Sequence, residues 1–199
     1  MQYLSQRLAL EPSEARDGER PRDPLARDQR ERVLAATEQL IAEKGCAGTT
    51  IEAIVKEAGV SSVTFYDHFA DKEECFVAAF DRAVGETRAE LIETVPQDLP
   101  WPDRVRAGLA ALLATIDAEP ARARLCLVEA QKGGPRMRAR YDEVLDGIAV
   151  ELSDPLGQAI AGGLAWLLRE RLELGGGGSV HDLLPRMTEV VLAPQPTHG

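Results

Sequence analysis

Apolar residues recur every three or four positions along most of the chain, and this period is typical of amphipathic helices. Between residues 24 and 44, for example, Val33, Leu34, Leu40 and Ile41 fall on one helical face. No run of alternating Val, Ile or Thr is long enough to indicate a β-strand. The pattern therefore predicts an all-α fold.

Proline, glycine and short polar side chains mark where the first helices begin and end. Pro24 suits the first turn of a helix, and Gly45 is expected to end that helix. Thr49 and Glu52 have the spacing of a capping box, in which each side chain bonds the other's backbone N–H, so a second helix should follow Thr49. Gly59 suits the left-handed turn that stops this second helix.

The next stretch, "SSVTFYDHF" at residues 61–69, predicts a third, short helix capped by Ser61. Asp71 and Glu74 then repeat the capping-box spacing before a longer amphipathic helix. Three consecutive helices, with a tight glycine-containing turn between the second and the third, are typical of a helix-turn-helix head.

Prolines and the pair Gly133–Gly134 divide the rest of the chain into further helices. These are predicted over residues 102–118, 121–132, 136–152, 156–174 and 180–192. We therefore expect three parts: a disordered or loosely packed, Arg-containing tail over 1–23, a helix-turn-helix DNA-binding domain over 24–72, and a larger helical body over 73–199.

A resemblance to a known family is carried by residues 49–80, TTIEAIVKEAGVSSVTFYDHFADKEECFVAAF. The Thr pair, Ala-Gly-Val-Ser at the turn, Phe-Tyr and His-Phe in the third helix, and Asp-Lys-Glu after it strongly resemble the TetR family of bacterial transcriptional regulators. The resemblance implies a three-helix DNA-binding head, and it implies that the C-terminal helical body over 73–199 is a regulatory and dimerisation domain that binds a ligand. It also implies a homodimer on a pseudo-palindromic, double-stranded DNA operator.

The third helix separates two kinds of aromatic residue. With Ser61 as its cap, Phe65 and Phe69 lie one turn apart and point into the core of the head, whereas Tyr66 points outward. The Tyr66 hydroxyl suits a phosphate and its ring suits a thymine methyl group, while residues at the helix start reach base edges. The expected DNA-binding residues are Thr50, Ser61, Ser62, Val63, Thr64, Tyr66, His68 and Lys72.

Two of these residues have a second interpretation. Lys72 lies in the first turn of its helix, where a cation opposes the helix dipole unless an anion is close. A DNA phosphate would be that anion, and a solvated lysine is the plainer alternative. Thr50 either caps the second helix or donates its hydroxyl to another phosphate.

The charge of the chain argues against binding to nucleic acid by electrostatics alone, since the formal net charge is -10 and the pI is about 4.9. Residues 27–72 carry six Lys or Arg against eight Asp or Glu. One acid, Asp67, lies on the helix expected to enter the groove. DNA binding would then require a few directional contacts that dimer symmetry doubles. The arginines of the tail either add phosphate or minor-groove contacts or stay solvated and unbound.

The body is expected to hold the dimer interface and the effector site. The expected interface residues, which combine small and apolar side chains, are Ala159, Gly162, Gly163, Trp166, Leu183, Leu184, Met187, Val190 and Val191. The resemblance implies a ligand cavity, for which the chain offers Val84, Trp101, Leu109, Leu112, Ile116, Leu127, Met137, Tyr141 and Leu145, each of which is also a plausible core residue. Arg136, Arg138 and Arg140 would suit an anionic effector, or a solvated helix start.

Catalytic and metal-binding motifs are absent from the sequence. The three histidines lack metal-ligand spacing, and there is no GxSxG motif or phosphate-binding loop. Cys46, Cys75 and Cys126 are expected to be buried thiols, with a redox-sensing thiol as the alternative. We therefore expect no enzyme activity, cofactor or metal, and, with no apolar run long enough to cross a membrane, a cytoplasmic bacterial protein.

Together these features predict a sequence-specific DNA-binding transcriptional regulator, a repressor that an unknown small-molecule effector releases from its operator. The alternative keeps the DNA-binding fold without the sensor, and its C-terminal body docks a protein partner. A DNA-incompetent or enzymatic derivative is a further rival, which only the acidic head supports. A cavity in the body favours the sensor, whereas a filled core with an exposed apolar patch favours the partner.

Overall fold

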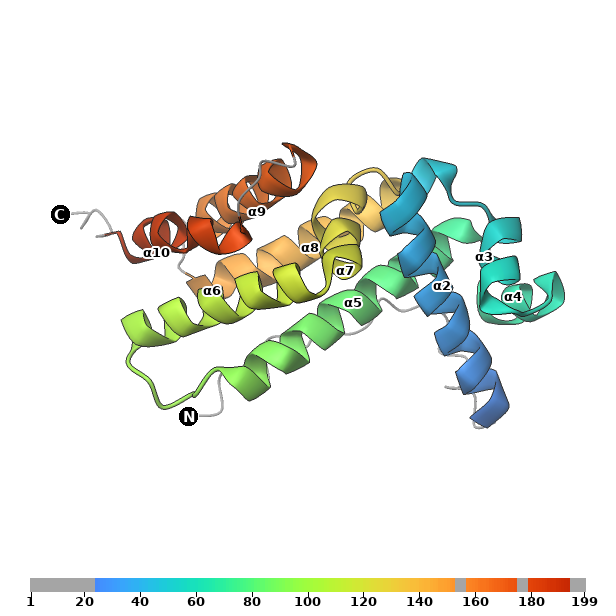
Figure 1. The fold of residues 1–199 in the computed structure, drawn as a ribbon, viewed down its shortest axis with the longest axis horizontal. Coiled ribbons are helices and arrows are strands. Elements are labelled where there is room, and N and C mark those ends of the chain that lie inside the picture. The colour runs from blue at the N-terminus through green and yellow to red at the C-terminus, as the bar shows by residue number, and fades with distance from the viewer. Residues whose placement is uncertain (1–23, 153–156, 175–178, 194–199) are drawn as a thin grey trace.

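The computed structural model describes residues 24–152, 157–174 and 179–193, and within these ranges all regular secondary structure is helical (Figure 1). The all-α prediction is confirmed. The elements are α2 (Pro24–Gly48), α3 (Ile51–Ala58), α4 (Ser62–His68), α5 (Lys72–Thr94), α6 (Trp101–Ala118), α7 (Pro120–Arg124), the π-helical turn η1 (Leu125–Glu129), α8 (Pro135–Leu152), α9 (Gly157–Leu174), the 3-10 turn η2 (Val180–Leu183) and α10 (Leu184–Leu192). The tail at 1–23 lies outside the described residues.

Helices α2, α3 and α4 form a head at one end of an elongated molecule, and α5 runs from this head along the body (Figure 1). One apolar core joins the head to the first half of α5, to η1 and to the start of α8. A second core lies among α6, α9 and α10. Because the first core contains residues of both the head and α8, the head is packed onto the body rather than tethered to it.

Two predicted boundaries differ from the structure. Gly45 has a left-handed φ of 70°, which glycine adopts without strain, but the chain then makes one more helical turn to Gly48. The capping box at Thr49 was also wrong by one residue. The N–H of Ala53 donates to Thr50 Oγ1 at 3.2 Å, whereas the buried Thr49 hydroxyl donates to the Gly45 carbonyl at 2.9 Å.

The other predicted cap residues are confirmed, although the Glu74 carboxylate accepts the Ala70 N–H, at 2.6 Å, rather than that of Asp71. Gly59 has a left-handed φ of 64° after α3, Ser61 caps α4 and Asp71 caps α5. The helix predicted over 121–132 is interrupted, because the N–H of Ala130 donates to the Leu125 carbonyl five residues back, at 3.0 Å, and so widens the helix into a π turn. No helix within the described ranges is long and apolar enough to cross a bilayer.

Candidate nucleic-acid interface

Helix α4 is short, and polar groups at both of its ends hold it in place. The N–H of Thr64 donates to Ser61 Oγ at 3.0 Å, and the two hydroxyls of this pair lie 2.9 Å apart. At the other end, the N–H of Phe69 donates to the Phe65 carbonyl at 2.9 Å. The hydroxyls of Ser61 and Thr64 thus serve the cap, and Thr64 is half-buried as well.

The side chains of α4 divide into a buried and an exposed set. Phe65 and Phe69 are 0% and 2% exposed, and their ring centroids lie 5.5 Å apart. Val63 and Tyr66 are 71% and 57% exposed. The buried pair anchors α4 on the head, so that Val63 and Tyr66, with the exposed Ser62, form an outward face at the end of the molecule.

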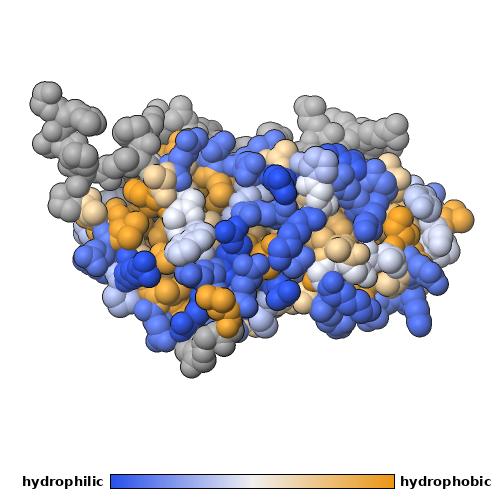
Figure 2. All heavy atoms as spheres, turned by 90° about the horizontal axis from the view of Figure 1, so that it is seen from above, coloured by the Kyte–Doolittle hydropathy of each residue, from blue (hydrophilic) through white to orange (hydrophobic). Residues whose placement is uncertain are grey.

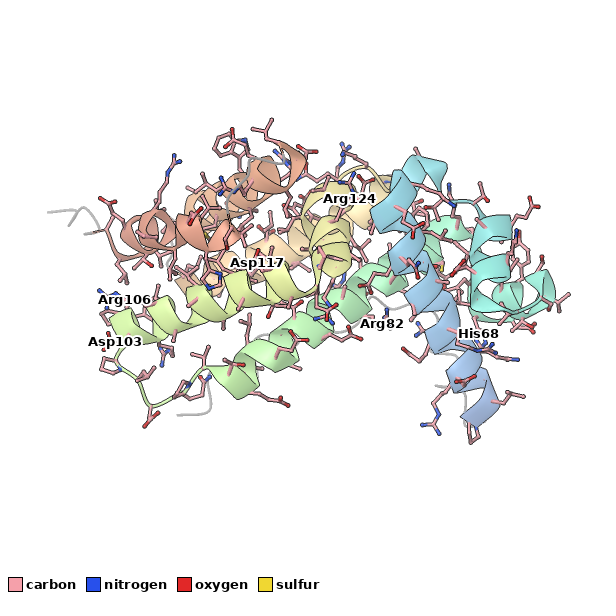
Figure 3. The ribbon with its side chains drawn as sticks, in the orientation of Figure 1. His68, Arg82, Asp103, Arg106, Asp117 and Arg124 are labelled. Atoms are coloured by element: carbon pink, nitrogen blue, oxygen red, sulfur yellow. The ribbon has the colours of Figure 1, made fainter. Side chains whose placement is uncertain are left out.

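His68 ends α4 and is half-buried, with its ring centroid 6.2 Å from that of Phe69 (Figure 3). Burial lowers the pKa of His68, the nearby Arg30 lowers it further, and Asp67 opposes them. His68 is therefore largely neutral at neutral pH and suits a phosphate as a hydrogen-bond donor rather than as a cation.

Thr50 is exposed at the N-terminus of α3, next to α4. Lys72 lies close by, because its Nζ donates to the Thr49 carbonyl at 3.1 Å and lies 5.3 Å from the centre of the Phe76 ring. An ammonium group has three N–H donors, so this bond leaves two of them for other acceptors. The arrangement thus brings a cation to the start of α3.

Sequence reasoning missed Arg30, which is on α2 and is half-buried. Its guanidinium carbon lies 5.3 Å from the centre of the Phe69 ring, which gives a cation–π contact beside α4. In the sequence Arg30 is simply a basic residue on the first helix of the head, and basic side chains on helices usually point into solvent.

The residues predicted to line an effector cavity are divided between the two cores. Val84, Met137, Tyr141 and Leu145 belong to the head-side core, and Leu109, Leu112, Ile116 and Leu127 belong to the second. Trp101 is 41% exposed, and its ring lies 5.5 Å from the guanidinium carbon of Arg104.

Two surface hollows of about 450 and 460 Å³ involve none of these residues. The first lies between the end of η1 and α8 and includes Lys132, Arg138 and Asp142. The second lies between α2, α5 and α7 and includes the ion pair of Arg82 with Glu38, whose Nη2 and Oε2 atoms are 2.8 Å apart. In Figure 3, Arg82 lies midway along the molecule. Charged side chains are thus part of the lining of both hollows.

The arginines proposed for an anionic effector already have partners in part. Arg140 Nε lies 2.6 Å from Asp81 Oδ1, and Arg136 bonds Asp71 and Glu73. Arg138 donates to the Gln131 carbonyl at 2.9 Å. The bonds of Arg136 and Arg140 thus tie α8 to the acids of α5 and its cap, whereas Arg138 bonds the turn that precedes α8.

The residues predicted for a dimer interface lie on α9, η2 and α10. Ala159, Gly163, Trp166 and Val190 are exposed, with Trp166 at 49%. Gly162, Leu183 and Leu184 are half-buried, whereas Met187 and Val191 are buried within the chain. Apolar side chains also reach the surface in separate patches elsewhere on the molecule (Figure 2).

Comparison with known proteins gives a family match to the head and longer matches to individual regulators. The family model described as bacterial regulatory proteins, tetR family, matches residues 33–79. The HTH-type transcriptional regulator EthR of Mycolicibacterium smegmatis is 28% identical over 125 residues, which cover 61% of this chain and 56% of that protein. The nucleoid occlusion factor SlmA of Marinomonas sp. is 25% identical over 133 residues, covering 66% and 68%.

The fold of most of the chain also has solved counterparts. The regulator FadR from Bacillus subtilis, solved in complex with stearoyl-CoA, superposes with a TM-score of 0.69 at 15% identity, covering 82% of this chain and 97% of that one. By sequence, the chain spans only 25% to 56% of the length of three curated relatives that it matches. The match of the head to this family model, together with the shared fold, supports the TetR family of bacterial regulatory proteins for this chain.

Proposed function

We propose that this protein is a sequence-specific DNA-binding transcriptional regulator. The observation that carries the proposal is the outward face of α4, where Val63 and Tyr66 are exposed at the end of the molecule beside the uncovered Thr50 cap of α3. An exposed short helix on a rigid three-helix support has the dimensions that the major groove of B-DNA admits.

Each exposed group suits a particular contact. Ser62 and Val63, at the start of α4, reach base edges, and Tyr66 offers its hydroxyl to a phosphate and its ring to a thymine methyl group. Thr50 and Lys72 suit phosphates near the start of α3, where free backbone N–H groups also point. Ser61 and Thr64 contribute mainly by fixing α4, since their hydroxyls bond within the cap.

A homodimer fits the acidic composition of the head, because two copies double a small set of directional contacts. The exposed small residues of α9 and the exposed Trp166 and Val190 support an interface between copies at α9 and α10. Two heads on a two-fold axis would enter successive major grooves about 34 Å apart, on a pseudo-palindromic operator.

For regulation, we propose a repressor that a small molecule releases from its operator. Helix α5 supports this proposal, because it begins at the head and packs against α6 and α8 in the body. A ligand that favours one tilt of α5 therefore also changes the position of the head. The FadR structure solved with stearoyl-CoA shares this fold. An acyl-chain ligand is therefore a reasonable first class of effector to test.

The alternative, a body that docks a protein partner, is favoured by the packing of the predicted effector residues into two cores and by exposed apolar residues such as Val150 on α8, at 65%. Native mass spectrometry of the protein from its host distinguishes the two. A bound small molecule that weakens operator binding supports the sensor. A ligand-free protein whose operator binding does not respond to acyl chains supports the partner.

DNA binding is tested by selecting sequences from random duplex DNA with the full chain, followed by gel-shift titration at physiological salt. Tyr66→Ala should weaken binding to the selected sequence by about tenfold or more, which corresponds to about 1.4 kcal/mol. Val150→Ala, which truncates an equally exposed residue far from the head, should leave the affinity unchanged. Equal affinity of Tyr66→Ala and the wild type would refute the assigned surface.

A further inference from the structure

The turn between η1 and α8 touches the head on both sides of the helix-turn-helix. Its first contact is with Cys46, four residues before the Thr50 cap of α3. Its second contact is with Asp71 and Glu73, at the start of α5 and just after α4. We call residues 129–136 the bracket, because its two end residues make these two contacts.

Glu129 makes the first attachment from inside the protein. Its side chain is only 5% exposed, and its Oε2 atom accepts the Cys46 N–H at 3.0 Å. Cys46 directly follows Gly45, whose positive φ bends the backbone of α2, so the bond fixes the chain at that bend. Lys132 and Arg124 lie 3.4 and 3.6 Å from Oε1 and balance the buried charge.

Arg136 makes the second attachment from the surface. Its backbone N–H donates to Glu73 Oε1 at 2.7 Å, and its Nε donates to Glu73 Oε2 at 3.3 Å. Its Nη2 lies 2.5 Å from Asp71 Oδ1, an atom that also accepts the N–H of Glu74 as the cap of α5. The planar guanidinium group thereby fixes a direction as well as a distance.

The glycines between these contacts let the bracket lie close against the head. Gly134 has a φ of 119°, and a Cβ atom there would overlap the carboxylate of Glu73. A Cβ atom on Gly133 would overlap the sulfur of Met137. The close approach to Glu73 therefore requires glycine at position 134, whereas Gly133 makes room for the Met137 side chain of α8.

The two attachments differ in what they contribute. Arg136 has a side chain that is 51% exposed, and exposed ion pairs of this kind add only about 0.2–1 kcal/mol to stability. The shared apolar core already packs the head onto the body, and two polar attachments at separate points add a restraint on the rotation of the head. The second contact therefore matters more for orientation than for stability.

We propose that Glu129 and Arg136 are positioning residues that fix the orientation of α3 and α4 on the body. In a dimer this orientation sets the separation of the two α4 helices, and so the spacing of DNA half-sites that the protein accepts. The inference rests on the proposed DNA-binding function and on the homodimer.

The experiment measures affinity against half-site spacing with the full chain. An operator is selected from random duplex DNA with the wild type, and derivatives are made with one or two base pairs added to or removed from its centre. Arg136→Ala should reduce the preference for the best spacing over the next best by about threefold or more. Arg106→Ala breaks a similarly exposed pair on α6, with Asp103 at 3.0 Å, and should keep the preference.

Glu129 is tested by a pair of variants. Glu129→Ala removes the acceptor for the Cys46 N–H and should relax the spacing preference, whereas Glu129→Gln keeps an amide oxygen that accepts this bond and should restore most of it. Should Glu129→Ala fail to fold, the surface variant Arg136→Ala still decides the question.

The outcomes separate this inference from the proposed function. If the wild type selects no sequence, the DNA-binding function fails and the inference fails with it. If the wild type selects an operator but Arg136→Ala keeps the wild-type spacing preference, the inference alone is overturned. A uniform loss of affinity at every spacing, as expected for Tyr66→Ala, would also contradict positioning.

Discussion

Phe65 and Tyr66 are neighbours in the chain, and their rings meet edge to face with centroids 5.5 Å apart and planes at 88°. Phe65 is fully buried and Tyr66 is 57% exposed. These two adjacent aromatic residues thus lie on different faces of α4, one buried and one exposed. Phe65 fastens α4 to the head, and Tyr66 is presented to solvent.

The two residues should therefore differ sharply in their effect on stability. Phe65→Ala should cost about 3–5 kcal/mol, because it leaves a cavity in the core that joins the head to the body. Tyr66→Ala should change the free energy of unfolding by no more than about 0.5 kcal/mol. Urea unfolding followed by circular dichroism measures both values, and similar losses for the two variants would contradict the assignment.

Gly45 should tolerate alanine poorly. Its φ of 70° is unfavourable for residues with a Cβ atom, and that atom would lie 2.9 Å from Glu129 Oε2. Gly45→Ala should lower the free energy of unfolding by about 1–3 kcal/mol. Gly108→Ala in α6, where a Cβ atom meets nothing within 4 Å, should instead raise it by about 0.5–1 kcal/mol. Thermal or urea unfolding of both variants provides the comparison.

Gly163 lies on the surface proposed for dimerisation, and its added Cβ would meet nothing within 4 Å in one chain. Gly163→Arg should therefore leave the monomer folded but block the approach of a second copy. Gly85→Arg, at an exposed glycine of α5 with the same open surroundings, should have no such effect. Sedimentation velocity gives the masses, and a Gly163→Arg variant that stays dimeric would place the interface elsewhere.

Asp71 should contribute to stability in a pH-dependent way. The N–H of Glu74 lowers the pKa of the Asp71 carboxyl group, and the hydrogen bond from Arg136 lowers it further. A carboxylate with a lowered pKa stabilises the fold above its ordinary pKa, and the contribution is lost as the pH falls through the lowered value. Asp71→Asn should be less stable than the wild type near pH 7, and the difference should shrink as the pH falls through the lowered pKa of Asp71.

The measurement for Asp71 is urea unfolding across this pH range. Asp67→Asn serves as the control, since it removes an exposed acid from the same head without touching the α5 cap. A difference for Asp71→Asn that stays constant down to acid pH would show that its charge is unimportant.

The thiols should be unreactive in the folded protein. Cys46 and Cys75 are buried as expected, whereas Cys126 is half-buried. Desolvation raises the pKa of each of the three thiols to about 12, so the reactive thiolate is scarce at neutral pH. An aromatic disulfide reagent near pH 8 should label them only at the rate of unfolding. Rapid labelling of a single thiol in the native protein would revive the redox-sensing alternative.

Local signals in the sequence were sufficient to predict the head. The caps at Ser61 and Asp71 and the turn at Gly59 depend on residues a few positions apart, and the division of Phe65 from Tyr66 follows from helical geometry alone. The Thr49–Thr50 error arises at the bend after α2, where the Thr49 hydroxyl donates to the Gly45 carbonyl four residues earlier and so does not cap α3.

Contacts between distant segments were not predictable in the same way. Glu129 reads as an ordinary acid in a helix, and only the π turn and the fold bring it to Cys46, 83 residues earlier. Arg136 likewise appeared as part of a basic run suited to an anion, whereas the structure pairs it with the acids that begin α5. The second residue of such a pair cannot be identified from either segment alone.

The length of α5 gives small movements in the body a large effect at the head. Its 23 residues make a rod about 34 Å long, at about 1.5 Å per residue. A tilt of about 5° at the body end would move the head end by about 3 Å, close to the rise of about 3.4 Å between successive base pairs. A tilt too small to alter the packing of the body would thus shift the head along the DNA by nearly one base pair.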